Sequence, residues 1–189
     1  MTLLALASAL SLAAHSHTPQ DSTVPVGSPP RPEPVYNVSL LLLARSVDDA
    51  EPADEHLGWG LEFDSYDPRD VVGWEMGVTR TSDDASDAGA KFETTLIEVY
   101  LGARKTWGAE RRLHPFVSGG LAWVDAEAEL SGSGSEDDSS FGLYGRGGAY
   151  WTFGEHFNVG ADVKALIGTD IEFGDADYVQ AGVIVGFSL

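Results

Sequence analysis

Two groups of side chains in this sequence have the residue types and spacing that could support chemistry, and the first is a histidine among acidic residues. His56 directly follows Asp54 and Glu55, and serines occur at Ser133 and Ser135. A histidine that is oriented by a carboxylate can take the proton of a serine hydroxyl and make that oxygen a nucleophile. Serine and acidic residues are abundant in both stretches, so we interpret the combination as coincidence and expect no catalytic residues.

The second group is acidic and could hold a metal ion. Asp170, Glu172, Asp175 and Asp177 supply carboxylate oxygens, and residues 136–138 could contribute more. Such hard oxygen ligands suit Ca²⁺ or Mg²⁺. Because the spacing lacks the order and the fixed glycine of an EF-hand loop, a solvated acidic loop is the alternative interpretation. We therefore predict weak binding of Ca²⁺ or Mg²⁺, and no cofactor.

Composition narrows the class of protein. The chain has 189 residues, with 30 acidic and 11 basic side chains and a net charge of −19. This charge excludes a nucleic-acid partner, because few side chains could neutralise phosphates. The sequence contains no cysteine, which excludes disulfides, thiolate chemistry and cysteine-based zinc sites. A single domain is expected at this length.

The N-terminal residues predict targeting rather than folded structure. Residues 3–14 are apolar and small residues follow them, which predicts a signal peptide over residues 1–16 that is cleaved after Ala13 or Ser16. About a dozen apolar residues are too few to span a hydrocarbon core of about 30 Å as a helix. Residues 17–34 contain six of the nine prolines and predict an extended linker. The folded domain is therefore expected over residues 35–189.

The elements that must position these side chains are predicted to be β-strands. No run approaches the roughly 18 consecutive apolar residues of a membrane-spanning helix. In the last segment, Val183, Val185 and Phe187 share one face, and Gln180 and Gly182 share the other. Eight segments have lengths that fit tilted strands crossing a bilayer, and they cover residues 35–47, 57–63, 71–81, 91–103, 115–129, 141–153, 157–169 and 178–189.

The connections between these strands differ by parity. Four alternate connections hold half of the acidic residues and no lysine or arginine, and they are residues 48–56, 82–90, 131–140 and 170–177. The other connections are short, as at residues 154–156, or locally basic, as at residues 104–112. Alternate connections of an up-and-down barrel emerge at the same end, so the pattern predicts one long-looped acidic rim and one short-turned rim.

The two faces of the predicted strands differ in polarity. The apolar face would contact lipid, and its aromatic residues are Trp59, Phe63, Trp74, Trp151, Phe157 and Phe187. The other face would line the lumen with charges of both signs, namely Glu62, Glu75, Glu98, Arg146, Asp162 and Lys164. An unpaired buried charge is costly, so we predict that Arg146 pairs with at least one of Glu62, Glu75 and Glu98. Side chains should fill the lumen of so small a barrel, which disfavours an open pore.

Three segments resemble a known family. Residues 114–122, 140–149 and 154–162 are glycine-containing amphipathic strands, the last entered through a short turn. They resemble the small outer-membrane β-barrels of the OmpA, OmpX and OmpW type. The resemblance implies an all-β fold, an eight-stranded antiparallel up-and-down transmembrane β-barrel in the bacterial outer membrane. It also implies contacts with outer-membrane lipid and lipopolysaccharide, and recognition of the C-terminal strand by the barrel assembly machinery.

Within such a family, the sequence favours a non-enzymatic barrel with acidic extracellular loops and a structural or surface-interaction role. One alternative is a secreted soluble barrel that binds a small apolar ligand, as lipocalins do, with its apolar faces turned inward. Another is a lipid A-modifying hydrolase or acyltransferase that uses the serine, histidine and acidic residues at the acidic rim. His114 and His156 fall at the opposite rim and are interpreted as turn residues.

Overall fold

The structure is a computed structural model that describes residues 33–47, 55–68, 70–87, 90–108, 111–130, 134–169 and 177–189. The predicted signal peptide over residues 1–16 lies outside the described residues. All but the last two residues of the predicted linker over residues 17–34 also lie outside them.

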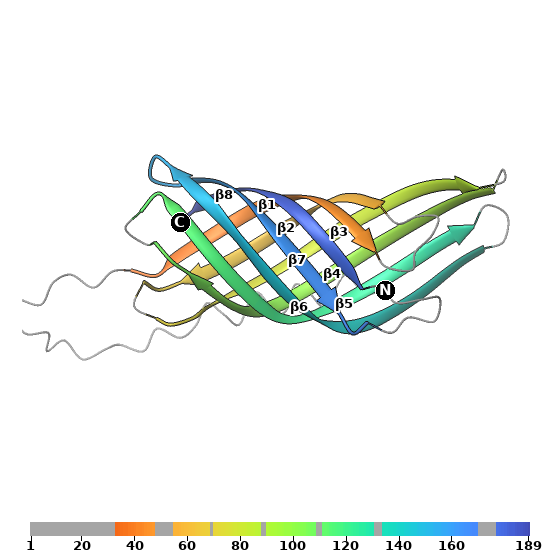
Figure 1. The fold of residues 1–189 in the computed structure, drawn as a ribbon, viewed down its shortest axis with the longest axis horizontal. Helices are drawn as coiled ribbons and strands as arrows, with labels where there is room; N and C mark the ends of the chain where they lie inside the picture. Colours follow the sequence, from red (N-terminus) through yellow and green to blue (C-terminus); the bar gives the residue numbers. More distant parts are fainter. Residues whose placement is uncertain are drawn as a thin grey trace, which may run out of the picture. The chain divides into compact units, whose positions relative to one another are not determined.

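The described residues form eight antiparallel strands that close into a barrel, in which each strand pairs with the next and β8 pairs with β1 (Figure 1). The strands are β1 (Val35–Val47), β2 (Glu55–Tyr66), β3 (Gly73–Asp87), β4 (Ala90–Thr106), β5 (Leu113–Leu130), β6 (Gly134–Phe153), β7 (Phe157–Ile167) and β8 (Tyr178–Ser188). None of the described residues forms a helix long and apolar enough to cross a membrane. The predicted all-β up-and-down barrel is confirmed.

Alternation of side chains gives this barrel a polar interior. In β1, Leu41, Leu43 and Arg45 point inward and are at most 4% exposed, whereas the outward Leu40 and Leu42 are 42% and 51% exposed. Successive strand residues point to opposite faces, so every second residue lines the lumen, and many of these inward residues are polar or charged. The closed ring also pairs the backbone groups of the strands with one another, which hydrocarbon surroundings require.

The outward surface of the barrel is apolar and rich in aromatic side chains. Five of the aromatic residues predicted to face lipid are 37% to 55% exposed, namely Trp59, Trp74, Trp151, Phe157 and Phe187. The sixth, Phe63, contacts the rings of Tyr36 and Trp74. A soluble lipocalin-like barrel would need these faces turned inward, so the structure argues against that alternative.

Four strands continue beyond the ring at one end of the barrel. We call this the loop end, because it carries the four connections predicted to be acidic, and we call the opposite end, with Leu189, the turn end. Pairing between β2 and β3 stops at Leu57 and Ser82, but pairing between β3 and β4 continues to Asp87 and Ala90. Figure 1 shows β3 to β6 reaching past the other strands. The projecting sheet, as we name it, consists of residues 83–87, 90–94, 125–130 and 134–142.

This sheet differs from the sequence prediction, which placed residues 82–90 and 131–140 in connections. Only residues 88–89 and 131–133 separate the paired strands. Asp, Ser and Gly have a low propensity for strands, so these stretches have the composition of loops. These stretches nevertheless continue β3 and β6, because β3 pairs with β4 and β6 pairs with β5 along them. β4 and β5 are also paired with each other as far as Phe92 and Leu130.

Candidate functional site

Within the described residues, the lumen contains nine charged side chains, none more than 5% exposed, and we call them the lumen charge network. Its acidic members are Glu62, Asp64, Glu75, Glu98 and Asp162, and its basic members are Arg45, Arg104, Arg146 and Lys164. All six residues predicted from the sequence to form this network point inward. The structure adds Arg45, Asp64 and Arg104 to them.

Arg104 is the centre of one half of the network. Its Nη1 lies 2.8 Å from Glu62 Oε1, 3.2 Å from Asp64 Oδ2 and 3.4 Å from Glu75 Oε2. The guanidinium carbon also lies 3.8 Å from the centre of the Phe116 ring. One cation therefore compensates three carboxylates from two neighbouring strands.

Arg146 joins this half of the network to the far side of the barrel. It donates hydrogen bonds to Glu62 of β2 and to Asp162 of β7. Of the three glutamates with which the sequence predicts pairing, Glu62 receives a hydrogen bond, and Glu75 Oε2 lies 3.7 Å from Arg146 Nη1. The ion pairs of Arg146 with Glu62 and Glu75 thus link β6 to β2 and β3, with which it shares no backbone pairing.

Glu98 is the centre of the second half of the network, nearer the loop end. Arg45 Nη2 lies 2.8 Å from Glu98 Oε2, and Lys164 and Tyr178 also donate hydrogen bonds to this carboxylate. Arg45 donates a further hydrogen bond of 2.8 Å to Gln180 Oε1. Three strands, β1, β7 and β8, therefore converge on one carboxylate of β4.

Two tyrosines fill the space between these charges. Tyr100 donates a hydrogen bond of 2.6 Å to Glu62, and Tyr144 donates one of 2.8 Å to Glu75. A Cβ atom at Gly77 or Gly102 would collide with the hydroxyl of Tyr100 or Tyr144, respectively. Glycine on the inward face therefore makes room for large polar side chains from neighbouring strands.

Both ends of the lumen are also filled. Toward the loop end, the inward residues Val47, Leu96, Val124 and Leu166 form an apolar cluster with Tyr178, and each is at most 6% exposed. At the turn end, a gap beside Asp64, Arg104 and Tyr150 has no room for a water molecule. The described part of the barrel is therefore a packed interior, as expected for eight strands.

The histidine, acidic and serine residues weighed as a catalytic alternative are only partly described by the structure. His56 is 1% exposed and lies inside the barrel on β2. Ser135 lies on β6, opposite Glu129 of β5, and its side chain is outside the description. Asp54 and Ser133 lie outside the described residues. The side chain of Glu55 is likewise outside the description.

The two other histidines within the described residues differ in position. His156 is exposed in the turn between β6 and β7, as predicted. The prediction that His114 is a turn residue is wrong, because it lies inside the barrel on β5, where its ring stacks on Tyr150 at 4.8 Å. The strand begins two residues earlier than predicted, and alternation then turns His114 inward.

Of the predicted metal ligands, only Asp177 lies within the described residues. Its Oδ1 accepts hydrogen bonds from the backbone N and the Oγ1 of Thr169, at 3.0 and 2.8 Å. Burial raises the pKa of Asp177, but these hydrogen bonds and one from Gly168 outweigh burial, so its pKa lies below the usual range. Asp170, Glu172 and Asp175 are outside the description, as are the side chains of Glu136 and Asp137. Within the described portion, no three ligating side chains are placed to hold a metal ion.

The sequence prediction missed Arg104 and Arg45 as lumen residues, although the alternation of inward residues in their strands points to both. The alternation Glu98, Tyr100, Gly102 continues to Arg104, which the sequence prediction assigned to a basic turn. β4 instead extends to Thr106 and turns Arg104 inward. Arg45 follows the inward Leu41 and Leu43 in the same way.

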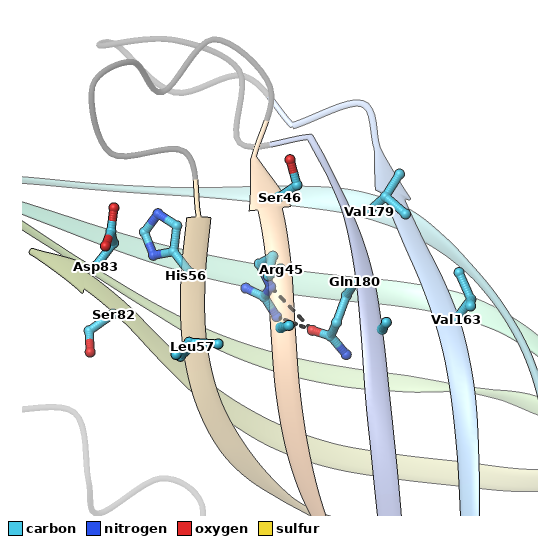
Figure 2. Close-up of a pocket in the computed structure, with 11 residues that line it drawn as sticks. Arg45, Ser46, His56, Leu57, Ser82, Asp83, Val163, Val179 and Gln180 are labelled. Carbon is cyan, nitrogen blue, oxygen red and sulfur yellow. Dashed lines mark hydrogen bonds between the residues drawn. The ribbon is translucent and has the colours of Figure 1, made fainter. Parts of the chain in front are cut away.

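A pocket of about 820 Å³ lies on the barrel wall near the loop end (Figure 2). Figure 2 shows Arg45 bonded to Gln180, two inward residues whose strands border the pocket. The outward residues that line it are Ala44, Ser46, Leu57, Ser82, Val163, Val179 and Ala181. The other four lining residues, Arg45, His56, Asp83 and Gln180, occupy inward positions of their strands, so most of the pocket, but not all of it, belongs to the outer surface.

Comparisons with known proteins agree with this architecture. Residues 2–189 match a family model described as "Outer membrane protein beta-barrel domain". The chain is similar to the solved structure of OprG from Pseudomonas aeruginosa, with 14% identity, a TM-score of 0.63, and coverage of 84% of this chain and 97% of that one. It is also similar to Ail from Yersinia pestis, with 13% identity, a TM-score of 0.59, and coverage of 85% and 100%, respectively. Identities this low show the fold alone. No curated protein matches the sequence.

Proposed function

This chain belongs to the outer membrane protein β-barrel family, and from that premise we propose that it is a non-enzymatic surface protein with a closed lumen. The predicted family resemblance and the predicted location in the bacterial outer membrane are confirmed. The proposal concerns what the barrel does in that membrane.

The projecting sheet is the observation that carries the proposal. In barrels of the outer membrane the longer connections face the exterior and the short turns face the periplasm, so we place the loop end outside the cell. The residues of the projecting sheet include ten acidic side chains and one lysine. A paired sheet that rises from the membrane with this charge is suited to contact another surface.

The lumen supports a closed barrel rather than a pore. Ion pairs cross the lumen at two levels, around Arg104 and around Glu98, and the apolar cluster extends from them toward the loop end. An open path would require these buried charges to separate, which is costly in a low-dielectric interior.

The charge of the projecting sheet favours a cationic partner. Electrostatic complementarity accelerates encounter with a positively charged surface and suppresses encounter with a negative one. The structure of Ail was solved in complex with a heparin analogue, sucrose octasulfate, which is a polyanion. The acidic sheet of the present chain should repel such a ligand.

Binding and conductance measurements on the refolded barrel test the proposal. Polylysine should bind wild type at low salt, and neutralising Asp83, Asp84 and Glu93 to Asn or Gln should weaken that binding about tenfold or more. Neutralising Asp170, Glu172 and Asp175, acids outside the projecting sheet, is the matched control and should weaken it less. In planar bilayers the wild-type barrel should show no steady conductance. Equal losses in the two variants would refute the role of the sheet, and a stable open channel would refute the closed lumen.

A further inference from the structure

The lipid-facing wall of the barrel contains a hollow in the half nearer the loop end. The pocket of Figure 2 and an adjoining one of about 450 Å³ share Ala44, Leu57 and Ala181. We call the outward surface that these two pockets share the wall hollow. The volume of each of the two pockets falls within the range of small-molecule sites.

Small side chains form the floor of the wall hollow. Ala44 of β1 and Ala181 of β8 are directly paired and both point outward. Larger residues flank this pair, with Leu57 paired to Ala44 and Val163 paired to Ala181. Two alanines between longer aliphatic side chains leave a depression that only apolar material can fill without loss of contacts.

An exposed arginine lies beside the hollow. Pairing across four strands produces an outward row of Val183, Leu42, Trp59 and Arg80, next to the row that contains Ala181 and Ala44. Arg80 is two strands from Ala44, which corresponds to about 10 Å. In the described part of the chain, no ion pair involves Arg80, although the lumen cations are each paired.

An unpaired guanidinium on this wall is available to bind an anion that lies at the same depth. Arginine facing lipid is destabilising near the bilayer midplane and much less so at the interface. Guanidinium groups bind phosphate through two parallel hydrogen bonds. Trp59, which is 51% exposed, is paired with Arg80 and marks the same interfacial level.

We propose that the wall hollow and Arg80 together bind one phosphorylated lipid of the outer leaflet, of the lipid A type. An acyl chain lies over Ala44 and Ala181, and a phosphate of its headgroup binds the guanidinium of Arg80. The assignment to the outer leaflet rests on the orientation proposed above, with the loop end outside. Binding through a charged headgroup and a shaped apolar floor separates a held lipid from bulk hydrocarbon.

Native mass spectrometry of the folded barrel released from detergent measures the lipid that stays bound. The probes are bisphosphorylated lipid A, the same lipid with its phosphates removed, and phosphatidylglycerol. Wild type should retain one bisphosphorylated lipid A, and its retention should be about tenfold greater than that of either other probe. Arg80→Gln should lower this retention about tenfold and abolish the preference for the phosphates.

Matched variants separate the two parts of the site. Ala44→Leu with Ala181→Leu fills the hollow and should also lower retention, whereas Ala103→Leu, outward on β4, should not. Arg112→Gln, exposed at the turn end, controls for charge. Heat-modifiable migration on a gel verifies that each variant is folded. Retention unaffected by Arg80→Gln, or equally affected by the control changes, overturns the proposal. Equal retention of phosphatidylglycerol overturns the assignment to lipid A. Neither result depends on polylysine binding, so the proposed role of the projecting sheet is tested separately.

Discussion

At the scale of single residues, the interior of this barrel is determined by how each buried charge is compensated. Arg146 supplies the only ion pair of Asp162 within the described residues, and Glu62 has partners besides Arg146. A buried ion pair contributes little net stability compared with an apolar replacement of both partners, but removal of one partner leaves a charge uncompensated. Single substitutions in the lumen charge network should therefore be far more damaging than their exposed counterparts.

Replacing Arg146 with Leu should lower the free energy of unfolding by about 3–5 kcal/mol, because Asp162 would be buried without a cation. Val163→Leu, on the adjacent outward position, is the matched control and should change it by less than about 1 kcal/mol. Urea unfolding in detergent micelles, followed by the gel shift of the folded barrel, measures both. If Arg146→Leu is as stable as wild type, Arg146 and Asp162 are not coupled.

Glu98 allows a sharper test of pairing. Glu98→Gln leaves Lys164 without its carboxylate and should cost about 3–5 kcal/mol of unfolding free energy. Adding Lys164→Met to Glu98→Gln should recover part of this loss, so the two substitutions should be non-additive by more than about 1 kcal/mol. The same urea titrations on the four proteins of the cycle measure the coupling. Strict additivity would mean that Lys164 is compensated elsewhere.

At the scale of elements, the sequence predicted the number of strands and the apolar face of most of them, and it misplaced several ends. The bounds of β1 agree with the prediction at both ends, because Pro34 precedes the strand and the acidic Asp48 and Asp49 follow it. The loop-end halves of β3 and β6 were missed, because Asp and Ser there carry no apolar alternation. Arg104 was missed for a related reason, since adjacent Lys105 made the strand end resemble a basic turn.

The strand ends that the sequence prediction did not recognise should also be dispensable for the folding and stability of the barrel. Asp83 and Thr94 are paired opposite each other, so residues 84–93 can be replaced by Asn-Gly, which favours a two-residue hairpin turn. The shortened protein should unfold with a free energy within about 1 kcal/mol of wild type, because stability is unevenly distributed along a chain. A full-length variant with the acids of residues 84–93 changed to Asn or Gln is the control. Failure of the shortened barrel to give a heat-modifiable band would show that the projecting sheet is needed for folding.

At the scale of the whole molecule, the net charge differs between the lumen and the loop end. The lumen balances five carboxylates with four cations, so most of the net charge of −19 lies elsewhere. The loop end concentrates acidic residues, both in the projecting sheet and in residues 48–56 and 170–177. Like charges close together raise a negative potential that attracts cations.

Divalent cations should therefore stabilise the loop end weakly. We expect calorimetry of the refolded barrel to show heat on Ca²⁺ addition, with an affinity at or weaker than about 0.1 mM. The signal should disappear when Asp170, Glu172, Asp175 and Asp177 become Asn or Gln, and it should persist in the control, in which three acids of the turn end, Asp67, Asp70 and Glu155, are neutralised in the same way. No heat and no change in Tm at millimolar Ca²⁺ would mean that these acids are only solvated.

The convergence of three strands on Glu98 also has a consequence for biogenesis. Arg45 of β1 precedes Glu98 in the chain, but Lys164 of β7 and Tyr178 of β8 follow it, so a growing chain that ends before β7 offers this carboxylate only one of its two cations. A half-built sheet exposed to hydrocarbon would carry an incompletely compensated charge until β7 and β8 are in place. Such a chain should therefore be safer in a hydrated place than in the bilayer until its last two strands have been made.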